Sequence, residues 1–304
     1  MKIHIPIWLK VLVTAVLLVL LVKTFAFTSC SIPFTGMENT LYQGEKVLVN
    51  KWSYGLRLPF TTIHFLSERV KKGDVVLFNN PIPGDKETPI FARGLFISRC
   101  VGVPGDTLML NRELLVTGQQ ILSPDSKQLY TYPYQAEDTL LFTLQQLGIQ
   151  KNQLVGYAEG RYMRSFSHYE HYLLKQRLGT SLDIRPVHAN NMDSYPLVIP
   201  SKGKSIQVYP WNVTLLCNTI LHHEGRQASV KNDTLLVDEK PVTAYTFQKD
   251  YYWMAANNPV NLADSRLFGL VPHNHLVGRA AYIWYSYRKE RIFQPVQEWK
   301  RLFI

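Results

Sequence analysis

The chain reads Ile32-Pro33-Phe34-Thr35-Gly36-Met37-Glu38-Asn39-Thr40-Leu41 a few residues after a long apolar segment. The run that follows, Lys46–Lys51, is short and mostly apolar with a charge at each end, which predicts a β-strand. Gly36 stands in the middle of the quoted stretch. Its missing side chain offers no oxygen, sulfur or nitrogen to attack a carbonyl, so Gly36 cannot act as a nucleophile.

Three more segments follow along the chain. They read Lys72-Gly73-Asp74-Val75-Val76-Leu77-Phe78, then Phe96-Ile97-Ser98-Arg99-Cys100-Val101-Gly102-Val103-Pro104-Gly105-Asp106, then Asp264-Ser265-Arg266 with Phe268-Gly269-Leu270-Val271-Pro272 and Val277-Gly278. Together with the first stretch, in this order, they resemble the four conserved boxes of bacterial type I signal peptidases. One segment alone would be weak, but four in the right order leave little room for coincidence. The middle of the chain has no match.

The resemblance implies a serine nucleophile just before the methionine and a lysine general base just before the arginine. The nucleophile position is Gly36 in this chain, and the base position is Ser98. A serine hydroxyl is far too weak a base to accept the proton. Arg99 cannot replace the lysine, because a guanidinium stays protonated.

Two further positions that the family uses also differ. The small hydroxyl residue that helps to hold the oxyanion is Phe34 here, and Leu262 stands where a hydroxyl orients the lysine. Loss of a nucleophile or base alone can cost about 10⁶-fold in rate, so we expect no activity above background. We also expect Phe34 to fill the space left by the dyad. Residues expected to keep a structural role at the former site are retained, namely Met37, Arg99, Asp264 and Arg266.

Other hydroxyl and thiol groups are weaker candidates for a nucleophile. Thr35 is adjacent to the gap, but a shift of one residue points a side chain to the other face of an extended segment. The Ser98 hydroxyl would face the cleft, but no general base would be available to remove its proton. Ser29, Cys30 and Ser31 are expected at the edge of the membrane.

Composition fits a folded protein with a sizeable core. The 304 residues include 46% hydrophobic and 18% charged residues, and the formal net charge is +10. That charge favours an anionic surface, and we expect membrane lipid and no nucleic acid. The three cysteines lack metal-ligand spacing, so we expect them to be small buried residues with at most one disulfide. We expect the protein to bind no metal and no cofactor.

The N-terminal segment Ile5–Phe27 is mostly apolar, and Lys10 and Lys23 can reach the membrane interfaces with their stems buried. Three interpretations remain. The segment is an uncleaved anchor, a cleaved signal peptide, or the leader of a lipoprotein with Cys30 as the acylated residue. The first is favoured, because the peptidase-like stretch begins within a few residues. We expect a single-pass protein of the cytoplasmic membrane with its main domain on the outer side.

The remaining signals are mostly short strands with turns. We expect a hairpin of Thr107–Leu110 with Glu113–Val116, and helices over Leu140–Leu147 and over Ser165–Leu178, with serine as the cap of the second. Further strands are expected over these ranges: Val75–Phe78, Leu95–Val101, Ile206–Val208, Ser229–Lys231, Thr234–Asp238, Thr243–Lys249, Tyr251–Met254 and Gly278–Tyr287.

This pattern predicts a mainly β protein: an N-terminal transmembrane helix, then a signal-peptidase-like antiparallel β core with an inserted α/β subdomain. We expect residues 1–28 to be the cytoplasmic tip and anchor, 29–117 and 245–304 the core, and 118–244 the non-catalytic insertion.

Some motifs have two interpretations. His168 and His171 share a helical face that suits a metal, but no third ligand is identifiable, and a solvated face is favoured. His222-His223-Glu224 and His273-Asn274-His275 are expected in loops. For contact with the membrane we select Tyr42, Trp52 and Phe60.

Three functions follow. The first is a catalytically inactive family member that binds signal peptides or modulates an active signal peptidase paralogue. The second is an active signal peptidase with non-standard residues such as Thr35. The third is a β-rich binding protein of the lipoprotein type, acylated at Cys30.

Overall fold

The computed structural model describes residues 6–57, 61, 64–65, 68–82, 84–85, 87–111, 114, 126–149, 152, 154–179, 181–187, 194–260, 263–286 and 300–301. The chain divides into two compact units, each described here by itself. The first unit comprises residues 1–32, 44–97 and 274–304, and the second comprises 33–43 and 98–273. The predicted insertion, 118–244, falls within the second unit, and its assignment as a separate non-catalytic domain stays a prediction.

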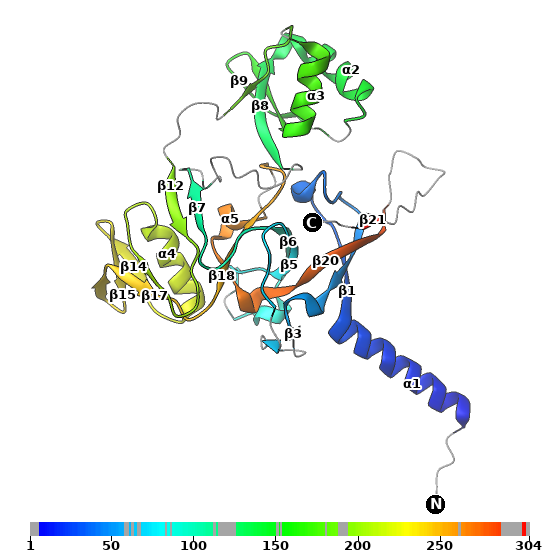
Figure 1. Cartoon of the computed structure of the whole chain (residues 1–304), viewed down its shortest axis with the longest axis vertical. Coiled ribbons are helices and arrows are strands. Elements are labelled where there is room, and N and C mark those ends of the chain that lie inside the picture. Colours follow the sequence, from blue (N-terminus) through cyan, green and yellow to red (C-terminus); the bar gives the residue numbers. More distant parts are fainter. Residues whose placement is uncertain are drawn as a thin grey trace, which may run out of the picture. The chain divides into compact units, whose positions relative to one another are not determined.

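The first unit begins with helix α1 (Ile7–Leu21), which continues as the π-helix η1 (Val22–Ala26) (Figure 1). These 20 residues are long and apolar enough to cross a bilayer, by length and composition. Lys51 Nζ donates a hydrogen bond of 2.8 Å to the Thr24 carbonyl, so one of the carbonyls at the end of the helix has a partner. The chain passes directly into strand β1 (Phe27–Ser31).

An antiparallel sheet forms the body of the first unit, in the order β1, β2 (Lys46–Asn50), β20 (Leu276–Tyr285) and β5 (Val75–Asn79). Gly278 lies beside Asn50, at one end of the pairing between β20 and β2. A Cβ at this position would lie 2.4 Å from the Asn50 carbonyl oxygen. The unit also has small elements: η3 (Lys51–Tyr54), β3 (Leu56–Arg57), β4 (His64–Phe65), η4 (Ile90–Ala92) and β21 (Lys300–Arg301).

Strand β6 (Leu95–Gly102) ends in the second unit, where it pairs with β18 (Tyr251–Ala255), and β18 pairs with β19 (Val271–Pro272). Around them lie three small antiparallel sheets and the helices α4 (Val213–Thr219), η6 (Ile220–Glu224) and α5 (Ser265–Phe268). The sheets are β7 (Thr107–Leu110) with β12 (Tyr195–Val198), β13 (Ser205–Gln207) with β17 (Ala244–Thr246), and β14 (Ala228–Lys231) with β15 (Thr234–Val237) and β16 (Lys240–Val242).

One apolar core joins these sheets. It contains side chains from β6, β7, β12, α4 and β18, among them Val101, Leu108, Leu197, Leu216 and Trp253, all nearly inaccessible to water. Because residues before 118 and after 245 pack here against residues 197–235, this part of the insertion shares its core with the peptidase-like segments.

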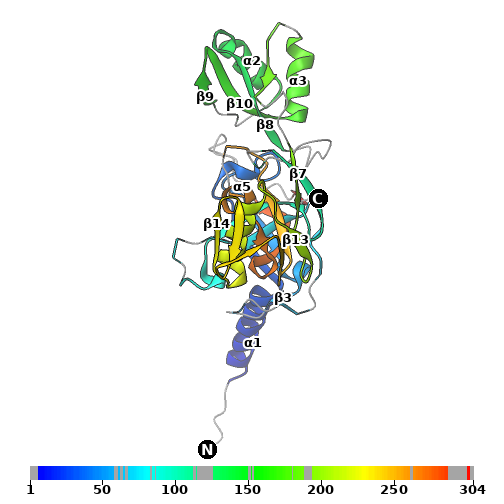
Figure 2. The same cartoon turned by 90° about the vertical axis from the view of Figure 1, so that its left-hand side faces the viewer.

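A second core lies between α2 (Glu137–Gln146), α3 (His168–Leu178) and one face of a four-stranded sheet (Figure 2). The sheet has the order β11 (Arg185–Pro186), β8 (Lys127–Pro133), β10 (Arg161–Ser167) and β9 (Leu154–Ala158), with the short η5 (Tyr134–Ala136) before α2. Strand and helix order is β-α-β-β-α-β, the topology of ferredoxin-like domains. The predicted α/β character of the insertion is therefore confirmed for residues 127–186.

The predicted class, mainly antiparallel β with an N-terminal helix, is confirmed. Several local predictions were wrong. The pairing of β7 with β12 was not predicted, and the predicted hairpin partner Glu113–Val116 lies outside the described residues except for Leu114. The cap of α3 is Ser167 rather than Ser165, in a complete capping box with Glu170. His222–Glu224 lies in the π-helix η6, not in a loop, and His273–His275 forms the 3-10 helix η7. All three cysteines are free.

Candidate functional site

Gly36 lies in the one-turn 3-10 helix η2 (Thr35–Met37) and is buried. Its carbonyl accepts a hydrogen bond of 2.9 Å from the Asn258 backbone N–H. A 3-10 turn has the negative φ that every L-residue adopts, so the backbone does not itself require glycine at this position. The missing side chain is a property of the sequence rather than a demand of the turn.

Ser98 lies inside β6 and is completely buried. Its Oγ donates a hydrogen bond of 2.8 Å to the Ala263 carbonyl. The hydroxyl proton therefore fixes the loop that precedes α5. In this geometry Ser98 works as a structural link and is not directed at a reacting group.

Phe34 departs from expectation. Its side chain is 60% exposed, so it does not fill a cavity at the former site. The residue has extended backbone geometry just before η2. The prediction of an apolar plug at Phe34 was therefore wrong, and a network of polar side chains flanks the site.

Part of that network is built around Thr40 and Asn257. Arg99 Nη2 donates to Thr40 Oγ1 at 2.7 Å, and Asn257 Nδ2 donates to the same oxygen at 2.8 Å and to the Glu38 carbonyl at 3.0 Å. The Arg99 and Asn257 side chains are buried, and Thr40 is half-buried. Arg99 thus braces the turn after Met37, and Met37 itself is 2% exposed.

Asp264 and Arg266 form a second brace. The Asp264 side chain caps α5 by accepting from the Arg266 backbone N–H at 3.0 Å, and it also accepts from the Ala256 N–H at 2.7 Å. The Arg266 guanidinium forms an ion pair with the same carboxylate, which is completely buried. Leu262, the position at which the family orients its lysine, lies outside the described residues.

The ion pair of Glu38 and Lys127 corresponds to no motif in the sequence. Lys127 Nζ lies 3.0 Å from Glu38 Oε2, with side-chain exposures of 2% and 6%. Asn258 Nδ2 donates to the same carboxylate oxygen at 3.3 Å, and the Lys127 N–H donates to the Asn257 carbonyl at 2.7 Å. Glu38 and Lys127 are 89 residues apart in the sequence, so no local sequence pattern predicts that they form an ion pair. The fold brings them together.

Lys127 is a buried lysine of this network, and its Nζ donates a hydrogen bond to Glu38 Oε2. A general base must accept a proton from the nucleophile, whereas this nitrogen is engaged as a donor to a carboxylate. The arrangement is therefore that of a structural ion pair.

Other titratable groups lie elsewhere in the second unit. Burial lowers the pKa of His273, whose Nδ1 is 3.1 Å from the Tyr252 hydroxyl. Burial, together with a hydrogen bond to Glu224, raises the pKa of Tyr251. Within the described part of the chain, no group of three His, Cys, Asp or Glu residues is arranged to hold a metal ion. His171 stacks on Tyr130 with ring centroids 4.3 Å apart.

The residues selected for contact with the membrane have different positions. In the first unit, Trp52 is 54% exposed and packs against Phe27, the residue that follows the apolar helix. Lys46 Nζ lies 5.5 Å from the Trp284 ring centre, a cation–π contact. Tyr42 is half-buried, and Phe60 lies outside the described residues.

Comparison with known proteins decides the family. The model of the family described as "Signal peptidase, peptidase S26" matches residues 5–185, more than half of the chain. The chain belongs to the signal peptidase S26 family. The resemblance inferred from the four segments is confirmed, and membership in S26 implies membrane association.

Two of the following relatives match over most of the chain, and the third matches over about two fifths of it. Signal peptidase I of Buchnera aphidicola subsp. Schizaphis graminum is 25% identical over 276 residues, which cover 90% of this chain and 72% of that protein. Signal peptidase I of Helicobacter pylori (strain J99) is 23% identical over 288 residues, 90% of this chain and 80% of that protein. Signal peptidase I of Bacillus licheniformis is 30% identical over 118 residues, 38% of this chain and 53% of that protein.

Proposed function

We propose that this chain is a catalytically inactive member of the signal peptidase family that binds signal peptides or modulates an active signal peptidase in protein secretion. One observation carries the proposal. The nucleophile position is Gly36, and the base position is Ser98, whose hydroxyl is hydrogen-bonded to the Ala263 carbonyl. Neither residue can start an acyl transfer, which needs a nucleophile and a group that removes its proton.

The retained network supports a kept scaffold. Arg99, Asp264 and Asn257 hold the turn of Gly36 and the loop before α5 through buried hydrogen bonds. Buried polar groups are costly unless they are satisfied, so such a network stabilises one arrangement of the site. A scaffold that keeps its site but not its reaction is suited to binding.

The location that we propose is the cytoplasmic membrane, with α1 and η1 as a single uncleaved span and the β core on the outer side. The apolar helix Ile7–Ala26 supports the anchor. Exposed Trp52 beside Phe27 supports an interfacial position for the adjoining surface, since tryptophan is enriched at the boundary of membrane and water.

A photo-crosslinking experiment tests the proposal. The purified full-length chain in lipid nanodiscs is mixed with a preprotein that carries a photo-crosslinker beside its cleavage site. We expect a crosslink to the chain and no cleaved product, and no crosslink to a matched protein without its signal peptide. Cleavage at the signal-peptide site overturns the inactive assignment. If neither crosslinking nor any change in the rate of an added active signal peptidase is observed, the binding and modulating roles are wrong.

A further inference from the structure

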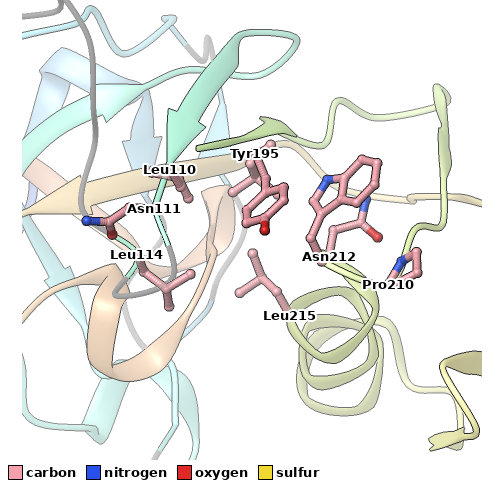
Figure 3. A pocket seen from close by; sticks show the side chains of 9 residues that line it. Leu110, Asn111, Leu114, Tyr195, Pro210, Asn212 and Leu215 are labelled. Atoms are coloured by element: carbon pink, nitrogen blue, oxygen red, sulfur yellow. The ribbon is translucent and has the colours of Figure 1, made fainter. Parts of the chain in front are cut away.

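A pocket of about 420 Å³ opens beside strands β7 and β12 and the start of α4 (Figure 3). Leu110 and Leu197 come from the two strands, and Leu215 comes from the helix. None of its lining residues belongs to the positions that correspond to the lost catalytic groups. The pocket is therefore a separate feature of the second unit.

One wall of the pocket is formed by the rings of Tyr195 and Trp211, and the Tyr209 ring, which does not line the pocket, stacks on Trp211. The Trp211 ring lies 4.4 Å from that of Tyr209 at an interplanar angle of 4°, and 5.8 Å from that of Tyr195 at 18°. Trp211 Nε1 donates to the Pro196 carbonyl of β12 at 3.2 Å, and Asn212 Oδ1 accepts from the Tyr209 N–H at 2.8 Å. These contacts fix the wall before any ligand arrives, which lowers the entropic cost of binding.

The opposite rim contains a leucine in an unusual backbone conformation. Leu114 has φ of +58°, a left-handed geometry that is uncommon for residues other than glycine. Its N–H donates a hydrogen bond of 3.0 Å to the Asn111 carbonyl. Figure 3 shows the Leu114 and Leu215 side chains facing one another, with the Tyr195 hydroxyl directed to the gap between them. The Leu114 side chain, carried by this left-handed residue, lines the pocket.

The chemistry of the lining restricts the ligand. Among the described residues that line the pocket there is no Asp, Glu, Lys, Arg or His, so a charged group would be desolvated there without a partner. The Tyr195 hydroxyl makes no hydrogen bond to another described residue and can serve as both donor and acceptor. A cavity of about 150 Å³ is enough for benzene, so this pocket has room for more than one ring.

We propose that this pocket binds a small uncharged molecule with two fused or linked rings and a single hydroxyl or amide group, which bonds to the Tyr195 hydroxyl. The rings lie between the leucines and against the aromatic wall. This inference is independent of the proposed role of the degenerate cleft.

The test uses 2-naphthol, 2-naphthoate and naphthalene in equilibrium dialysis against the full chain in nanodiscs, with empty nanodiscs subtracted. We expect saturable binding of 2-naphthol and naphthalene and no binding of 2-naphthoate. Leu215→Trp fills the pocket and should abolish binding, whereas the matched change Leu141→Trp, at an exposed position on α2, should leave it unchanged. If the native chain and Leu215→Trp bind 2-naphthol equally, the proposed site is wrong. If 2-naphthoate binds saturably, the proposal that the ligand is uncharged is wrong.

A second variant tests the same site if Leu215→Trp fails to fold. Tyr195→Phe removes only the hydroxyl and keeps the ring stack. We expect it to weaken 2-naphthol by about 5-fold, the contribution of one hydrogen bond, and to leave naphthalene within 2-fold. If Tyr195→Phe changes the affinities for 2-naphthol and naphthalene equally, the Tyr195 hydroxyl does not recognise the ligand and the proposed ligand class is wrong.

Discussion

Replacing Lys127 by methionine removes one partner of the buried Glu38–Lys127 pair. Glu38, 5% exposed as a residue, would then keep Asn258 Nδ2 at 3.3 Å as its remaining side-chain donor among the described residues. Breaking a buried ion pair by removal of one partner costs about 3–5 kcal/mol, because the other charge stays buried. We expect Lys127→Met to lower the free energy of unfolding by about 3 kcal/mol, a factor of roughly 150 in the unfolding equilibrium.

A double-mutant cycle separates this effect from lost packing. Glu38→Gln alone leaves the Lys127 ammonium unpaired and should cost a similar amount, whereas Glu38→Gln/Lys127→Met buries no charge at this pair. We expect the double variant to be more stable than the sum of the single changes predicts, by at least about 2 kcal/mol.

The assay is pulse proteolysis in urea of the full chain in mild detergent. Lys240→Met, the same change at an exposed position on β16, is the matched control and should stay within about 0.5 kcal/mol of the native chain. A cost below about 1 kcal/mol for Lys127→Met, or simple additivity in the cycle, would refute the view that this pair holds the site together.

Three further changes test other parts of the structure. Ser98→Ala should destabilise the chain by about 1 kcal/mol in the same assay, because the Ala263 carbonyl loses its donor; an unchanged midpoint would contradict the structural role of Ser98. Ser167→Ala should cost about 1 kcal/mol by removing the cap of α3, and Ser165→Ala, inside β10, should not affect helix content measured by circular dichroism. His273→Gln should flatten the pH dependence of thermal unfolding between pH 7.5 and 5. Burial holds the pKa of His273 below its unfolded value of about 6.5, so stability is complete above that pH and falls as the pH drops through it. An unchanged pH profile in His273→Gln would show that protonation of this ring does not limit stability.

Local sequence patterns predicted most strands of the β core, because turn residues and short apolar runs act within a few positions. The strands β5, β6 and β18 end within one residue of expectation. The pairing of β7 with β12, which begins about 85 residues later, was not predicted, because a hairpin is the nearest option in sequence. The predicted hairpin partner, Glu113–Val116, lies outside the described residues except for Leu114. Long-range pairing depends on the whole fold, and no local pattern encodes it.

The site shows the same contrast. The loss of the nucleophile and base was visible at Gly36 and Ser98, because a motif fixes those positions. The surroundings of the site could not be predicted from the sequence. Phe34 faces solvent, and the ion pair of Glu38 with Lys127 joins the turn of Gly36 to β8, the first strand of the α/β sheet. A buried charge is favourable only with its partner, and the partner is known only after folding.

The central claim is that the chain keeps a signal peptidase site without its chemistry. It is tested most directly by cleavage of a preprotein by the native chain beside a Gly36→Ser/Ser98→Lys variant, both full-length and in nanodiscs. We expect no cleavage by the native chain and weak but measurable cleavage at the signal-peptide site by the variant, abolished again by returning either position to its native residue. Cleavage by the native chain, retained in Ser98→Ala and lost in Thr35→Val, would contradict the account and make Thr35 the nucleophile.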